Sequence, residues 1–177
     1  MIDSKEYAKA LFLLAKEEGL LSRFEGELKT LSALFTENPD YATLLDTPAV
    51  SEEEKLALID EALSGFDTYI VSFVKILATK RMTHRLTACI REFEALYDEE
   101  RGIEHAEAIT AVPMTERQKN TLSEKLGRIT GKSIVLHNTV DPDVLGGVRV
   151  RCKSIEIDGT FRTRLSELEK AIKRQIV

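Results

Sequence analysis

The sequence contains no tryptophan and little cysteine or proline, with two cysteines and four prolines among 177 residues. The two cysteines, Cys89 and Cys152, lie far apart and have no histidine at ligand spacing. This spacing indicates neither a zinc site nor a redox pair. We therefore expect both cysteines to be small, buried apolar residues.

Long hydrophobic runs are also absent, because no stretch approaches the roughly 20 apolar residues that a membrane-spanning helix requires. The first residues lack the basic and then apolar order of a signal peptide, so we expect a soluble chain in the cytosol. The net charge of −5 argues against broad nucleic-acid binding, although the C-terminal third is locally basic. Hydrophobic residues make up 43% of the chain, enough for one mid-sized domain or two small ones.

Apolar residues in the first half recur at the spacing of amphipathic helices, with turn residues between the runs. The pattern predicts six helices, near residues 4–18, 21–37, 41–45, 51–65, 67–81 and 83–97. Ser51 and Glu54 form a capping box, and the acidic run after Ser51 suits the positive end of a helix dipole better than a metal site. Gly65 is expected to end that helix.

Beyond Gly102 the hydrophobic period falls towards two, which indicates strands. The expected elements are strands at 106–112, 133–140 and 146–152, a pairing extended by Ile155 and Ile157, and two helices. The first helix begins at the capping box of Thr115 and Gln118, carries Leu122, Leu126 and Ile129 inward, and ends at Gly131. The second is terminal and carries Phe161, Leu165, Leu168 and Ile172.

These patterns predict a mainly α fold with a smaller α+β part. We expect a six-helix bundle over residues 1–104, followed over residues 105–177 by a small sheet with two helices.

No motif indicates catalysis. Residues 127–133 end in the Gly-Lys-Ser of a phosphate-binding loop, but three residues separate the glycines where that loop has four, and the segment follows a helix. Gly131 as a helix cap explains the same residues. His84, His105 and His137 occur singly, without a nucleophile or paired carboxylates, and we expect structural roles for them. We expect no catalytic residue, cofactor or metal ligand.

Two of the predicted helices carry unusually wide apolar surfaces. At about 100° per residue, the apolar side chains of residues 7–15 cover roughly 260° of the helix, and those of residues 66–78 cover about 220°. Two interpretations stay open: both helices lie centrally in the bundle, or they share a groove for an amphipathic helix of another protein. The basic residues of the terminal helix are either solvated or face an acidic partner.

Several segments together resemble one family, the delta subunit of bacterial and chloroplast ATP synthases, called the oligomycin sensitivity conferral protein in mitochondria. They are residues 7–12, the breaks at 38–39 and 47–48, residues 115–118 and 130–132, residues 140–148, and residues 157–160. The resemblance covers nearly the whole chain. Residues 152–154 depart from the family pattern, where a glycine-containing turn is common, and Thr160 replaces a more usual serine.

The resemblance implies a non-catalytic subunit of the peripheral stalk that links the stationary stalk to the catalytic head and resists rotor torque. Its partners would be the N-terminal segments of the alpha subunits and the b subunits of the stalk, with one copy per complex. The place implied is the cytoplasmic face of the bacterial plasma membrane, with contact to the membrane only through the complex.

The resemblance also suggests contact residues. The expected head-binding residues are Tyr7, Leu11, Leu14, Phe73, Leu77 and Arg81. The expected stalk-binding residues are Leu165, Leu168, Ile172 and Arg174. A structural turn is expected at Asp141, Gly146, Gly147, Asp158 and Gly159.

Two other classes remain open from the residues alone. An unrelated adaptor that binds a helix would have the same wide apolar surfaces. A small nucleic-acid-binding protein would account for the basic terminal helix, but the exposed aromatic pairs typical of single-strand recognition are missing.

Overall fold

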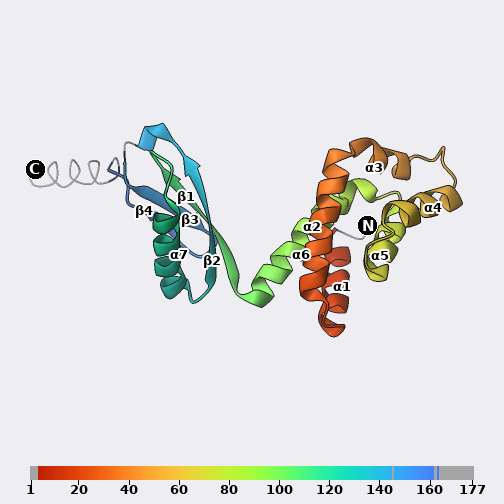
Figure 1. Cartoon of the computed structure of the whole chain (residues 1–177), viewed down its shortest axis with the longest axis horizontal. Coiled ribbons are helices and arrows are strands. Elements are labelled where there is room, and N and C mark those ends of the chain that lie inside the picture. Colours follow the sequence, from red (N-terminus) through yellow and green to blue (C-terminus); the bar gives the residue numbers. More distant parts are fainter. Residues whose placement is uncertain (1–3, 145, 162, 164–177) are drawn as a thin grey trace, which may run out of the picture. The chain divides into compact units, whose positions relative to one another are not determined.

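The computed structural model describes residues 4–144, 146–161 and 163 of the chain. The chain forms two compact units, divided between Asp98 and Glu99. Figure 1 shows helices in the first unit, and a sheet with a helix in the second. The coarse fold class is confirmed, since the described residues form seven α-helices and one small four-stranded sheet towards the C-terminus.

The first unit follows the predicted order of helices. They are α1 (Ser4–Glu17), α2 (Leu21–Glu37), α3 (Pro39–Asp46), α4 (Glu52–Ala62), α5 (Thr68–Thr79) and α6 (Leu86–Arg101), with a 3-10 turn, η1 (Thr83–Arg85), before α6. The capping box is confirmed at α4, where the Ser51 hydroxyl accepts from the Glu54 N–H and the Glu54 carboxylate accepts from the Ser51 N–H.

Some boundaries were predicted wrongly. Helix α3 begins at Pro39, whose fixed backbone angle suits the first helical turn, and not at Tyr41. Helix α4 ends at Ala62, and Leu63, 2% exposed in the core, follows as its C-cap. Gly65 therefore does not end this helix, and it lacks the positive φ of a left-handed cap.

Apolar side chains from all six helices of the first unit share one core. Its largest fully buried side chains include Phe24 and Phe93, and the Phe93 ring meets that of Phe12 edge to face, with centroids 5.8 Å apart. Each such side chain contributes about 1.5–3 kcal/mol when it leaves water. The core is what fixes the positions of α1 and α5.

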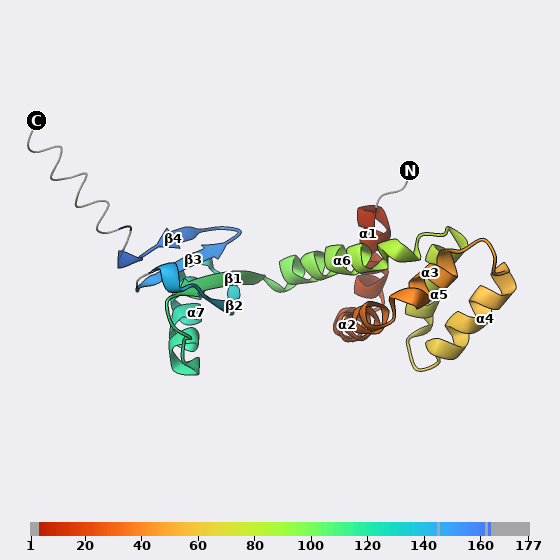
Figure 2. The same ribbon diagram turned by 90° about the horizontal axis from the view of Figure 1, so that it is seen from above.

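The second unit is a βαβ motif extended by a hairpin. Its elements are β1 (Ile103–Thr110), α7 (Glu116–Thr130), β2 (Ser133–Val140), a 3-10 turn η2 (Pro142–Val144), β3 (Val148–Cys152) and β4 (Glu156–Asp158). The strand order is β2-β1-β3-β4, with β1 and β2 parallel and the other pairs antiparallel. Figures 1 and 2 show α7 along one face of this sheet.

Three expectations for the second unit need comment. Strand β1 begins at Ile103, directly after Gly102, whose φ of 62° lets the chain turn out of α6. Ile129 is 62% exposed, because the four-residue spacing from Leu126 gives the inward position of the last turn to Thr130, which is half-buried. The terminal helix expected over residues 161–172 lies almost entirely outside the described residues.

Candidate partner-binding site

Helix α1 carries more apolar side chains than the core covers. Its buried residues are Ala8, Leu11, Phe12 and Ala15. Of the three predicted head-binding residues on this helix, Tyr7 and Leu14 are half-buried and Leu11 is only 5% exposed. Leu13, in contrast, is 47% exposed. The apolar arc of α1 is thus divided between the core and the surface.

Helix α5 is divided in the same way. The predicted contact residues Phe73 and Leu77 are 6% and 0% exposed, so they belong to the core. Arg81 is exposed and takes a left-handed backbone conformation, with φ of 55°. The apolar surface on α5 comes from Ile76, 49% exposed, and Tyr69, 40% exposed, which the contact prediction missed. The periodicity showed how wide the arc is, but not which side the core takes.

An acidic side chain from a neighbouring helix fixes the start of α5. The Glu27 carboxylate on α2 accepts a hydrogen bond from the Asp67 N–H at 2.6 Å. Asp67 is itself the N-cap, and its carboxylate accepts from the Tyr69 N–H at 3.0 Å. Arg23 on α2 lies 3.3 Å from the Asp67 carboxylate. These contacts hold the first turn of α5 against α2.

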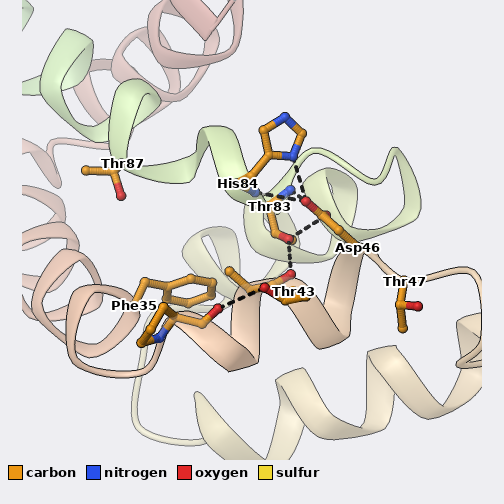
Figure 3. A pocket seen from close by; sticks show the side chains of 9 residues that line it. Phe35, Thr43, Asp46, Thr47, Thr83, His84 and Thr87 are labelled. Atoms are coloured by element: carbon orange, nitrogen blue, oxygen red, sulfur yellow. Dashed lines mark hydrogen bonds and ion pairs between the residues drawn. The ribbon is translucent and has the colours of Figure 1, made fainter.

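A second carboxylate cap lies beside a cavity of about 570 Å³ between α3 and the start of α6. Figure 3 shows the Asp46 carboxylate of α3 beside the His84 ring, with Nδ1 at 2.6 Å. The same carboxylate accepts from the Thr83 and His84 N–H groups at 2.8 and 3.1 Å. Burial works to raise the pKa of Asp46, but these donors and the Thr83 hydroxyl hold that pKa below its usual value. The imidazole and the hydroxyl thus fasten η1 to α3.

The glycines of the predicted turn bring two backbone segments together in the second unit. A Cβ on Gly147, where φ is 84°, would lie 2.5 Å from the Gly159 carbonyl oxygen. A Cβ on Gly146 would lie 2.8 Å from the ring of Phe161, whose N–H donates to the Gly146 carbonyl at 3.1 Å. Only glycine fits both positions without displacement.

The two aspartates of this turn hold it in place. The Asp158 carboxylate accepts from the Thr160 N–H at 3.0 Å and pairs with Arg149 at 3.0 Å, and the pKa of Asp158 lies well below its usual range chiefly because of the Thr160 N–H. Asp141 donates its N–H to the Thr110 carbonyl and accepts from the Asp143 N–H at 3.0 Å. The backbone of the hallmark segments is therefore fixed by short-range hydrogen bonds.

The segment that resembles a phosphate loop has a structural role. Gly131 ends α7 with φ of 72°, and Lys132 lies 3.2 Å from the buried carboxylate of Glu104 at the start of β1. That carboxylate also accepts from the Ser154 N–H and hydroxyl at 2.7 and 2.8 Å. The pKa of Glu104 is lowered to about 2, and the hydrogen bond from the Ser154 hydroxyl contributes most to this. Burial acts in the opposite direction and raises the pKa. Ser154 lies where the sequence departs from the family pattern, and its hydrogen bonds to Glu104 fix this turn to the start of β1.

Within residues 4–144, 146–161 and 163, no three histidine, cysteine or acidic side chains gather to hold a metal. No helix in this part of the chain is long and apolar enough to cross a membrane. The described surface presents half-exposed apolar side chains on α1 and α5, and further exposed apolar side chains on other elements, among them Val112 and Ile129. The fold defines a two-part protein, built from a helical unit and an α+β unit.

The family is shown by sequence comparison. Residues 4–172 match the model of the family described as ATP synthase delta (OSCP) subunit, and the chain belongs to this family. Among curated relatives, ATP synthase subunit delta of Rhizobium rhizogenes is 33% identical over 96% of this chain and 92% of its own length. The protein of the same name from Rhizorhabdus wittichii is 36% identical over 96% of this chain and 94% of its own.

A solved structure shares the fold. A chain in the cryo-EM structure of the Toxoplasma gondii mitochondrial ATP synthase hexamer is 20% identical, with a TM-score of 0.70. The likeness covers 97% of this chain and 98% of that one. It extends over both units, so the succession of helical and α+β parts is a shared feature of fold.

Proposed function

We propose that this chain is the non-catalytic subunit that joins the peripheral stalk of a proton-translocating ATP synthase to its catalytic head. The observation that carries the proposal is the family match over residues 4–172, which spans both units. A rotor driven by protons would turn the head with it unless a stationary stalk opposed the torque. A connector between stalk and head needs affinity at two surfaces and no chemistry of its own.

The helical unit is proposed to bind the N-terminal segments of the alpha subunits. Half-exposed apolar side chains on α1 and α5, such as Leu13 and Ile76, favour an amphipathic helix as the ligand. Of the predicted contact residues, Tyr7 and Leu14 are partly exposed and Arg81 is exposed, so these three side chains would contact the alpha subunits directly. Leu11, Phe73 and Leu77 would act from beneath, by holding the two helices in place. We also propose that the six helices of this unit fold as a bundle without the second unit.

The second unit is proposed to bind the b subunits of the stalk. The residues expected there, Leu165, Leu168, Ile172 and Arg174, lie outside the described residues, so this assignment rests on the family resemblance. The same reasoning gives one copy per complex, located peripherally at the cytoplasmic face of the bacterial plasma membrane.

The partner assignment is tested by pull-down of the full chain from native membranes, followed by mass spectrometry. Alpha and b subunits should copurify with it. An adaptor of another kind would bring down different proteins, and a nucleic-acid-binding protein would bring down RNA or DNA. Deleting residues 165–177 should abolish recovery of b and leave recovery of alpha intact. If a folded truncation recovered neither alpha nor b subunits, the assignment of one partner to each unit would be contradicted.

The head-binding surface is tested with Ile76→Glu and Leu13→Glu. Because both side chains are about half exposed, the variants should fold, while a charge placed against an apolar helix should weaken binding at least about tenfold. Titration against a peptide copying the alpha N-terminus measures this. Ala33→Glu, at an exposed position of α2 and therefore outside both helices of the proposed surface, is the matched control and should bind normally. Unchanged affinity in folded Ile76→Glu and Leu13→Glu would exclude this surface.

A further inference from the structure

The two edges of the sheet differ in how they are protected. Strand β4 forms one edge and is only three residues long, and its Glu156 and Asp158 pair with Arg151 and Arg149. Strand β2 forms the other edge and runs for eight residues without a charge, a proline or a glycine. Its register with β1 is continuous over residues 133–140, so no bulge interrupts it. Natural sheets protect their edges with short strands, charges and bulges, and β2 has none of these.

Alternate backbone groups of β2 point away from the sheet. The N–H groups of Ser133 and Asp141 donate to β1 or its flank, at the Gly102 and Thr110 carbonyls, both at 2.9 Å. Because the direction alternates along a strand, the even-numbered residues face outwards. The outward N–H and C=O groups are those of Ile134, Leu136, Asn138 and Val140. In the described part of the chain no strand lies beyond β2, which Figures 1 and 2 show at the margin of the sheet.

Side chains around this edge indicate what would bind there. Val135 and Val140 on the strand are 48% and 44% exposed, so an added strand would cover apolar surface. Two basic residues precede the strand: Arg128 lies in the last turn of α7, and Lys132 pairs with Glu104 at 3.2 Å but keeps 42% of its side chain exposed. Two acidic residues, Asp141 and Asp143, follow the strand. An antiparallel segment would place its first residues beside the aspartates and its last residues beside Arg128 and Lys132. Complementarity therefore requires a segment that is basic at its start and acidic at its end.

We propose that the outer edge of β2 binds an extended segment of another ATP synthase subunit as an antiparallel fifth strand. The segment is basic at its N-terminal end, apolar or β-branched in the middle, and acidic at its C-terminal end. Backbone hydrogen bonds to the outward groups supply affinity, and the flanking charges set the direction. The identity of the partner as a subunit of this complex rests on the proposed function, whereas the open edge rests on the sheet alone.

Amide hydrogen exchange in the assembled complex tests the proposal directly. The amides of Ile134, Leu136 and Asn138 should exchange readily in the free chain and at least about tenfold more slowly in the ATP synthase that contains it. Unprotected amides in an assembled complex would overturn the inference while leaving the proposed function intact. Protection already present in the free chain would also overturn it, because the chain itself would then cover the edge. Failure to assemble would count against the proposed function, and the edge itself is tested separately by peptides.

The peptide test uses two short synthetic strands of alternating threonine and valine. One has lysines first and aspartates last, and its matched control has the charges in reverse order. The first should bind the full chain about tenfold more tightly by fluorescence anisotropy. Val135→Lys, which adds a charge to the open edge, should weaken that binding about tenfold, and Ile157→Lys on β4 should not. Equal binding of both peptides, an unaffected Val135→Lys variant, or a dimer of the free chain through β2 in sedimentation would each overturn the proposal.

Discussion

The helical unit is stabilised mainly by a continuous apolar core, to which each of α1 to α6 contributes. The sheet unit has a much smaller core cluster, whose buried members in the described part are Ala106, Leu126 and Val150. Its strands and turns are joined instead by polar contacts, of which those of Glu104 and Asp158 are the most extensive. The two units are thus stabilised in different ways, and their stabilities should respond differently to mutation and to acid.

The largest effect is expected from removing a core aromatic of the helical unit. Phe93→Ala leaves a cavity beside Phe12 and should cost about 3–5 kcal/mol, because Phe93 is fully buried. Urea unfolding, followed by signals of each unit in NMR spectra, measures the loss. Leu13→Ala, at an exposed position of α1, is the control and should cost little. A similar loss in both variants would contradict the core as described.

Glycine substitutions should act in opposite directions in the two units. Gly147→Ala combines a left-handed backbone with a Cβ 2.5 Å from a carbonyl oxygen, and should destabilise the sheet unit by about 1–3 kcal/mol or more. Gly26→Ala, where a Cβ meets nothing within 4 Å in the middle of α2, should stabilise the helical unit by about 0.4–1 kcal/mol. Thermal unfolding of each unit distinguishes the two. A tolerated Gly147→Ala would show that the two turn segments can separate.

Acid should weaken the sheet unit through Glu104. Its pKa is about 2 when folded and 4.5 in the ordinary state, so the unfolded chain takes up the proton first as the pH falls. The stabilisation is complete above pH 4.5 and is lost as the pH falls to about 2. Glu104→Gln should remove this part of the pH dependence, measured by urea unfolding at a series of pH values. Glu124→Gln, at an exposed position of α7, should not change it.

The smallest losses of stability are expected at the two capping boxes, which allow the same motif to be compared in both units. Ser51→Ala and Thr115→Ala should each cost about 1 kcal/mol, because a cap satisfies backbone N–H groups within its own helix. Unfolding of the corresponding unit measures each cost. A much larger loss for Thr115→Ala would show that α7 depends on its cap in a way that α4 does not.

Much of the secondary structure is predictable because it is determined locally. Both capping boxes and the left-handed Gly131 were identified from residues within one or two turns of each other. Strand β2 was predicted with its observed ends. Two of the errors, at Gly65 and Ile129, arose where packing decided which residue faces the core. The local sequence does not determine which of these residues faces the core.

The contact surface was less predictable than the fold. The wide apolar arcs of α1 and α5 were visible as patterns, but a pattern does not say which part of an arc faces the core. Leu77 became fully buried and Ile76 half exposed, although they are neighbours in the sequence. The position of the surrounding helices decided this.

The sequence by itself determined the periods, caps and glycine turns, and through its motifs the family, because each depends on residues close together in the chain. Tertiary structure alone decided the long-range polar contacts, since they join residues far apart in sequence. Glu104 meets Ser154 fifty positions away, and Asp46 caps a turn that begins 37 residues later at Thr83. It also decided which edge of the sheet stays open, because an edge exists only after strands from distant segments have paired.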